Sequence, residues 1–353
     1  MSGLNDWLRQ HADQLDLSAE LAEQVLPALA GADLLRIGVP QAHGGAGGDV
    51  RDAIIAISVV AEQSLTAAFT FWGQRTFIEY MLQSPNQAMA ERRLPDLLSG
   101  KQAGATGLSN AMKFLSGIEQ LQISATPQAD GWSLDGGLAW LTNLRKAGFS
   151  AAAAVAPAKG APPAVVAFDS TGSGVLRSPD LDLIALRGSN TASIKLAQVR
   201  IPAGDIIATD GPAWLPAVRP SFLGMQCGLS IGLARASLAR AAQISADSRN
   251  QLGARIAALQ ENLAKYVHTL LAGVHDGSFK AEAPAMFRLR LVLAELVQQA
   301  LMLELQAMGG RAYLDKEQQG FARRWRESAF IPIITPSVTQ LQAALQQHES
   351  KAA

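Results

Sequence analysis

Hydrophobic residues along the chain follow a helical period first, then a strand period, then a helical period again. Near the N-terminus, four apolar residues recur at the spacing of one helix face: Leu21, Val25, Leu26 and Leu29. Similar patterns predict helices over residues 54–61, about 67–81 and 87–98. A glycine-dense connector over 38–48 separates the helix that contains Leu21–Leu29 from the helix over 54–61, because so many glycines do not sustain a helix.

The period changes to two between residues 104 and about 205. Polar and apolar residues alternate over 119–126, and Asp135 with Gly136 gives a turn signal. Further strands are predicted over 152–155, 164–168 and 193–199. Short strands at close intervals indicate a compact antiparallel sheet domain.

Helical patterns return from residue 213 onward. They predict helices over 224–244, 252–273 and 283–309, and a last helix after Pro336. Gly224, Gly228 and Gly232 recur every four residues, which favours close helix packing inside a bundle. A membrane dimerisation motif fits less well, because Arg235 and Arg240 interrupt the apolar stretch.

These patterns together predict an α+β fold that is mostly α. We expect an N-terminal helical domain over residues 1–103, a β domain over 104–212 and a C-terminal four-helix bundle over 213–353. The chain of 353 residues, 48% hydrophobic and 17% charged, is long enough for two or three packed units that share a large core.

Composition excludes several classes of function. The 30 basic and 30 acidic side chains balance, so we expect no broad attraction to nucleic acid or to an anionic membrane. Cys227 has no second cysteine to pair with, and the five histidines lack metal-ligand spacing, so neither a disulfide nor a metal centre is expected. The charged N-terminus does not resemble a signal peptide, and we expect a cytoplasmic protein without a membrane span.

Five short strings, in order along nearly the whole chain, resemble motifs of the acyl-CoA dehydrogenase superfamily. GVPQAHGGAG at 38–47 is similar to the family's PEEYGG-type loop, and AWLTN at 139–143 to its WITN strand. LRGSNT with VRIP, over 186–202, resembles its RxSxT…VxVP segment. SRNQLG at 248–253 and QAMGGRAY at 306–313 resemble its RxQFG and QxxGGxGY motifs. The resemblance implies the acyl-CoA dehydrogenase fold and a bound FAD.

The resemblance assigns one group of residues to the flavin ring. Thr142 would give a hydroxyl to the reactive edge of the ring, Trp140 a flat apolar surface, and Thr106 a contact to the pyrimidine edge. From the residues alone, the simpler alternative is a surface threonine and a core tryptophan.

A second group would hold the phosphates and adenine of the cofactor. The resemblance implies that Arg249, accompanied by Gln251, reaches a cofactor bound mainly by a neighbouring subunit, in a homodimer or homotetramer. It implies a similar contact for Gln306, Gly309 and Gly310, where bare backbone permits close approach. The alternatives are a surface ion pair of Arg249 and a helix C-cap at the two glycines.

The chain departs from the family most clearly at the position of the catalytic base. Thr335 stands where the family has a glutamate, and a threonine hydroxyl is no base near neutral pH. The helix around 219–226, where some relatives carry the base, has no Asp or Glu either. Glu304 and Glu327 are the nearest acidic residues in sequence, and we expect both to be structural. The catalytic residues are therefore unknown.

The entry to the β domain also departs from the family. Its TEPxxGSD loop is replaced by ATGLSNAMK over residues 105–113, which puts CoA binding in doubt. Ser109 and Asn110 are the polar residues that we expect to line the substrate mouth in its place.

Three functions follow from this combination. The first is an FAD-dependent oxidoreductase that acts on the CH–CH group of an acyl thioester, with its base supplied from elsewhere and electron-transfer flavoprotein as a partner. The second is a two-component monooxygenase that uses reduced FMN or FAD supplied by a flavin reductase. The third is a non-catalytic flavin-binding relative. The first two act on a small-molecule substrate.

Overall fold

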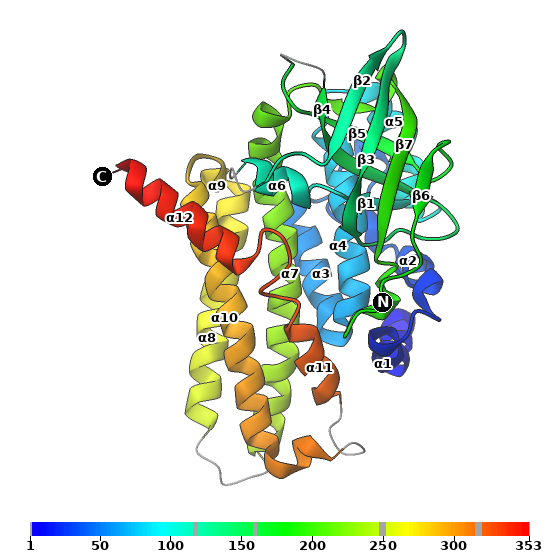
Figure 1. Cartoon of the computed structure of the whole chain (residues 1–353). Coiled ribbons are helices and arrows are strands. Elements are labelled where there is room, and N and C mark those ends of the chain that lie inside the picture. The colour runs from blue at the N-terminus through cyan, green and yellow to red at the C-terminus, as the bar shows by residue number, and fades with distance from the viewer. Residues whose placement is uncertain (1, 116–118, 158–160, 247–251, 315–319, 353) are drawn as a thin grey trace.

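The computed structural model describes residues 2–115, 119–157, 161–246, 252–314 and 320–352. Helices come first, a sheet follows, and long helices complete the chain, with the sheet at one end of the molecule (Figure 1). The predicted order and the mostly helical α+β class are thereby confirmed.

The N-terminal part is helical, and its two central helices begin at polar caps. The side chain of Asp49 accepts from the backbone of Arg51, and Asp52 accepts from the backbone of Asp49, so a capping box starts α3. Ser64 caps α4, which is buried on nearly all sides. The elements are α1 (Ser2–Leu17), α2 (Ala22–Gly31), η1 (Leu34–Arg36), η2 (Gln41–His43), α3 (Val50–Gln63), α4 (Leu65–Leu82) and α5 (Gln87–Leu98).

One sheet follows, together with a short helix. The strands run in the order β6-β7-β3-β2-β4-β5-β8, and β1 pairs with β4. The elements are β1 (Ala103–Thr106), α6 (Ser109–Leu115), β2 (Ile123–Gln128), β3 (Gly131–Leu141), β4 (Phe149–Pro157), β5 (Ala164–Asp169), β6 (Val175–Arg177), η3 (Arg187–Ser189), β7 (Ala192–Pro202), η4 (Ala203–Asp205) and β8 (Ile206–Ala208).

Two details of the predicted sheet are wrong. The sheet is mixed, because β4 pairs in parallel with both β1 and β2. Asp135 and Gly136 do not form a turn, since both lie inside β3, which pairs with β2 on one side and β7 on the other. Gly136 has a φ of 140° beside a register shift, so the glycine marks an irregularity within a continuous strand.

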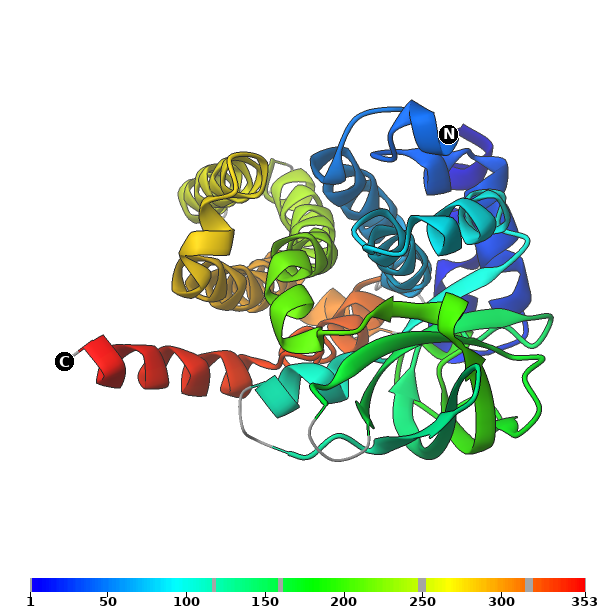
Figure 2. The same cartoon turned by 90° about the horizontal axis from the view of Figure 1, so that it is seen from above.

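Three long helices, α7, α8 and α10, dominate the C-terminal part, and α7 also packs along α3 (Figures 1 and 2). The predicted last helix, α12, packs against α10 but projects past the bundle (Figure 2). The elements are α7 (Gly211–Ala246), α8 (Gly253–His275), α9 (Ser278–Ala281), α10 (Ala283–Met308), η5 (Gly309–Tyr313), α11 (Phe321–Ser328) and α12 (Val338–Ala352).

By length and composition alone, the segment Ala283–Tyr313 is long and apolar enough to cross a membrane. Half of its most apolar window is buried inside the protein, where Leu293 and Val297 of α10 belong to the core. A core helix passes the same test, so this segment is weak grounds for a membrane span.

The glycines of α7 let this helix lie almost in contact with the backbone of α3. A Cβ added at Gly228 would lie 2.9 Å from the carbonyl oxygen of Ile54, and one at Gly232 would lie 2.1 Å from that of Ser58. A backbone oxygen cannot move aside as a flexible side chain can. Close helix packing, as predicted from the spacing, is confirmed.

We predict that Gly232→Ala destabilises the protein by roughly 1–3 kcal/mol, because the new methyl forces α7 and α3 apart. Gly253→Ala is the matched control, since an added Cβ there meets nothing within 4 Å. Urea unfolding of both variants measures the difference. Equal stability of the two variants would contradict the packing described for α7.

Candidate functional site

A buried glutamine on α4 ties together the segments that carry the predicted flavin-ring residues. The Gln74 amide donates to the carbonyl oxygens of Leu97 at 2.8 Å and Gln102 at 3.0 Å. Its Oε1 accepts from the backbone of Gly104 at 2.6 Å and from Nδ2 of Asn143 at 2.9 Å. One side chain therefore fixes both β1 and the end of β3 against α4.

The end of β3 carries a buried threonine and an exposed tryptophan. Thr142 is 4% exposed, and its hydroxyl donates to the carbonyl oxygen of Ser189 at 3.1 Å. Trp140 is 64% exposed. Asn143, in the left-handed region at φ 62°, turns the chain here. The alternative of a surface threonine and a core tryptophan is wrong, because the exposures are reversed.

Thr106, the other predicted ring contact, ends β1 and is buried. Its hydroxyl lies 2.8 Å from that of Tyr80, a residue of α4. Burial raises the pKa of the Tyr80 phenol, which therefore keeps its proton. The side chain of Thr142 lies against Gly73, also on α4. Gly73 and Tyr80 are two turns apart on one helix face, so α4 spaces the two threonines by about 10 Å along its axis.

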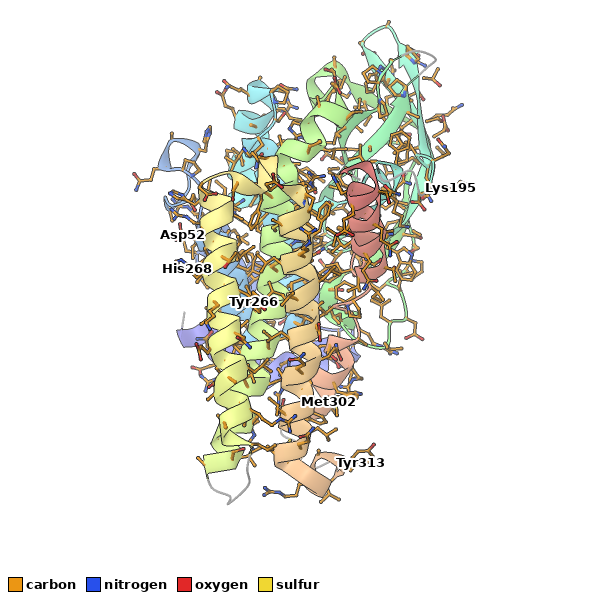
Figure 3. The ribbon with its side chains drawn as sticks, turned by 90° about the vertical axis from the view of Figure 1, so that its left-hand side faces the viewer. Asp52, Lys195, Tyr266, His268, Met302 and Tyr313 are labelled. Atoms are coloured by element: carbon orange, nitrogen blue, oxygen red, sulfur yellow. The ribbon has the colours of Figure 1, made fainter. Side chains whose placement is uncertain are left out.

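The second predicted group lies at the far end of the bundle. Gln306 is exposed near the end of α10 and accepts from Arg255 at 3.0 Å. Gly309 caps α10 with a φ of 56°, so the C-cap interpretation applies, and both Gly309 and Gly310 are exposed. Figure 3 shows Tyr313, just beyond them, at the opposite end of the molecule from Lys195 of the sheet.

The two predicted groups are therefore apart within one chain. Arg249 and Gln251 lie outside the described residues. A cofactor that touched both groups would have to be shared between two copies, as the resemblance implies, and the oligomeric state stays a prediction.

Residues 331–335, the segment that carries the position of the family's glutamate, are fastened to two helices. Gln226 of α7 donates to the carbonyl oxygen of Thr335 at 3.0 Å. Arg290 of α10 donates to the other end of the same amide at 3.0 Å and to the carbonyl oxygen of Ile331 at 2.8 Å. Burial lowers the pKa of the Arg290 guanidinium, which has no carboxylate partner among the described residues.

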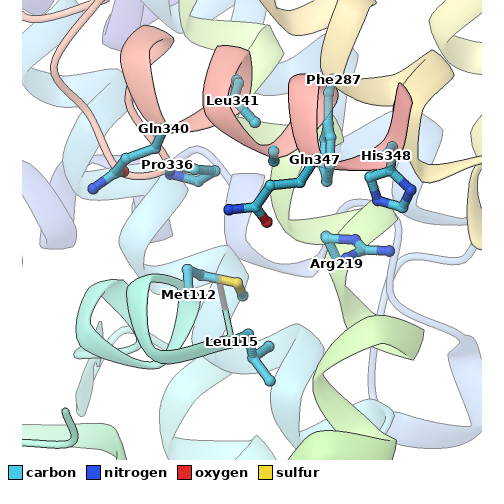
Figure 4. Close-up of a pocket in the computed structure, with 10 residues that line it drawn as sticks. Met112, Leu115, Arg219, Phe287, Pro336, Gln340, Leu341, Gln347 and His348 are labelled. Carbon is cyan, nitrogen blue, oxygen red and sulfur yellow. The ribbon is translucent and has the colours of Figure 1, made fainter. Parts of the chain in front are cut away.

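A cavity of about 190 Å³ lies beside this segment (Figure 4). Its walls come from α6, α7, α10, α12 and Pro336, and the described residues that form them include no carboxylate. The lining residues are Met112, Leu115, Arg219, Phe287, Pro336, Gln340, Leu341, Ala344, Gln347 and His348. Nor does any group of His, Cys, Asp and Glu suited to a metal ion occur in the described part of the chain.

Residues 4–101 match the family model of the acyl-CoA dehydrogenase N-terminal domain. Over most of its length the chain is also similar to the probable acyl-CoA dehydrogenase YngJ of Bacillus subtilis, with 24% identity over 92% of this chain and 88% of that protein. These similarities support the acyl-CoA dehydrogenase superfamily for this chain.

Solved structures share the fold of the whole chain. One is KijD3 in complex with FMN and a dTDP-sugar, with a TM-score of 0.80 and 19% identity over 98% of this chain and 92% of that one. Another is dibenzothiophene monooxygenase from Paenibacillus, with a TM-score of 0.78 and 16% identity over 100% of this chain and 96% of that one. The acyl-CoA dehydrogenase fold therefore extends beyond the N-terminal match.

Glu304 and Glu327, which we expected to be structural, both lie in buried ion pairs with arginines. Glu304 is fully buried and accepts two hydrogen bonds from Arg324, one of them at 3.0 Å. Glu327 is fully buried, accepts from Arg323 at 3.0 Å and accepts from the backbone of Leu65 at 3.0 Å. Neither lines the cavity, so neither replaces the family's base there.

The predicted mouth residues, Ser109 and Asn110, lie on α6, and their place at a substrate mouth stays a prediction. Asn110 is buried, and its amide donates to Glu119 at 2.8 Å and accepts from the backbone of Gln122 at 3.0 Å, so it holds the chain after α6. Ser109 does not line the cavity either. Met112 and Leu115, one turn apart on α6, line it instead. A loop is expected here from the sequence, which favours polar residues. The i, i+3 spacing of Met112 and Leu115 was the signal that could have indicated a helix face.

We predict that Gln74→Met destabilises the protein by roughly 3 kcal/mol, because four buried backbone and side-chain partners lose their hydrogen bonds. Gln299→Met makes the same chemical change at an exposed position of α10 and should stay within about 0.5 kcal/mol of the parent. Denaturant unfolding measures both. Similar stability of the two variants would show that Gln74 does not hold β1 and β3 together.

Proposed function

We propose that the chain is a flavin-dependent oxidoreductase. The observation that carries this proposal is the exposed ring of Trp140 beside the buried hydroxyl of Thr142. An exposed indole on a strand loses apolar contact that a planar ligand restores, and a fixed hydroxyl next to it gives that ligand an orientation. Thr106 supplies a second hydroxyl, and the similarity to flavoenzymes supports a flavin ring as the planar ligand.

The rest of the cofactor is proposed to lie on a second copy of the chain. Arg249 and Gln251 would contact the pyrophosphate of the cofactor. Gln306, Gly309 and Gly310 would contact its phosphates or its adenine. Support comes from the separation of these glycines from Trp140 within one chain, and from their open backbone. FAD reaches across such a distance with its adenine half, so we propose FAD in a homodimer or homotetramer. Reduced FMN or FAD from a reductase is the alternative.

The reaction proposed is oxygenation by reduced flavin, and it rests on the cavity beside Pro336. Removal of a proton next to a thioester carbonyl requires a base within hydrogen-bond reach, and none of the described residues that line this cavity is a carboxylate. Bound reduced flavin would supply the activation of oxygen, for which no such base is needed. The fold shared with a monooxygenase agrees with this choice.

Acyl-thioester dehydrogenation is the second candidate, favoured by the similarity to a probable acyl-CoA dehydrogenase. It needs a base from another residue type. His348 lines the cavity, and among the described lining residues its imidazole is the group suited to take up a proton. This candidate therefore assigns proton removal to His348.

One experiment separates the two candidates. Flavin-loaded protein is mixed anaerobically with a panel of acyl-CoA esters, and the visible absorbance of the oxidised flavin is followed. We expect no bleaching, and we expect oxygen to be consumed once a reductase and NADH supply reduced flavin. Bleaching by an acyl-CoA ester, abolished in His348→Gln, would establish the dehydrogenase instead. Failure of the folded protein to retain any flavin would refute both.

A further inference from the structure

The cavity beside Pro336 is small, open to solvent on one side, and lined by side chains of four helices. Its volume of about 190 Å³ is that of roughly six water molecules and lies below the range of pockets for drug-sized ligands. A whole CoA thioester is many times larger. The cavity therefore fits a compact molecule, or one short end of a longer one.

Arg219 gives this cavity a positive charge that the protein does not neutralise. Its guanidinium makes no hydrogen bond or ion pair to any described residue and lies 5.3 Å from the ring centre of Phe287. By contrast, the buried arginines Arg75 and Arg323 each pair with a glutamate. Burial lowers the pKa of Arg219, which means that the charge is partly desolvated without compensation.

The other walls are apolar or neutral. Met112 and Leu115 form one wall, and Leu341 and Ala344 belong to α12, while Gln340 and Gln347 add amides. Figure 4 shows Arg219 and His348 together on one side, with Met112 and Leu115 facing them from α6. A ligand with one negative group for Arg219 and a short apolar part for the opposite wall would satisfy both sides.

We propose that this cavity binds a compact carboxylate whose anionic end pairs with Arg219 and whose apolar part packs against Met112 and Leu115. A guanidinium offers two parallel donors, which matches the geometry of a carboxylate. The inference rests on the proposed function only in making this ligand the substrate; binding itself needs no flavin chemistry.

Calorimetric titration of the purified, flavin-loaded protein tests the proposal with hexanoate as the probe and hexanamide as its uncharged counterpart. Hexanoate should bind saturably, and hexanamide about tenfold more weakly, because it lacks the charge. Arg219→Met should weaken hexanoate about tenfold and leave hexanamide nearly unchanged. Arg200→Met removes an exposed arginine of the sheet and serves as the matched control.

Equal affinity for hexanoate and hexanamide in the parent protein would overturn the proposal, and so would unchanged hexanoate binding in Arg219→Met. Tight CoA binding that Arg219→Met abolishes would overturn the compact ligand in favour of a phosphate-bearing one. The parent comparison stands even if Arg219→Met does not fold. Flavin absorbance, recorded on the same samples, reports separately on the proposed function, since flavin loss leaves the carboxylate titration interpretable.

Discussion

The hydrogen bonds of the Gln74 side chain are the interaction on which the geometry of the ring site depends. A buried amide has two donors and one acceptor oxygen, and here the protein satisfies all of them with four groups from α5, the turn before β1, β1 and the end of β3. Because a shift of β1 or β3 on α4 would break these buried hydrogen bonds, the side chain of Gln74 holds the two strands together on this helix. The distance between Thr106 and Thr142 is therefore set by α4, which both residues contact.

The C-terminal part is ordered by a different principle, in which buried charges are either paired or left for a function. Glu304 and Glu327 are neutralised by arginines, and removing one partner of such a pair typically costs several kcal/mol. Arg290 donates to an amide oxygen and a carbonyl oxygen and so fixes the segment before Pro336, while its Nη1 has no hydrogen-bond partner among the described residues. Arg219 is the exception among these, and it is the one that lines a cavity.

Much of this architecture could be predicted from the sequence, because it depends on local periods. The helix patterns and the glycine spacing of α7 could be recognised because the geometry of a helix alone determines which residues share one of its faces. The parallel pairing of β4 with β1 could not be predicted, since strand register depends on contacts between distant segments. The burial of Asn110 could not be predicted for a related reason, because its partners Glu119 and Gln122 come together around it only in the folded chain.

The shared cofactor site and the oxygenation chemistry both build on one central claim, that the face at the end of β3 holds a flavin ring. Fluorescence titration of the apoprotein with FAD and FMN tests it most directly, with Trp140→Ala compared with Trp325→Ala, which removes an exposed tryptophan from α11. The account predicts saturable binding that Trp140→Ala weakens about tenfold and Trp325→Ala leaves intact. Equal flavin affinity in both variants, or no flavin binding by the folded parent protein, would contradict it.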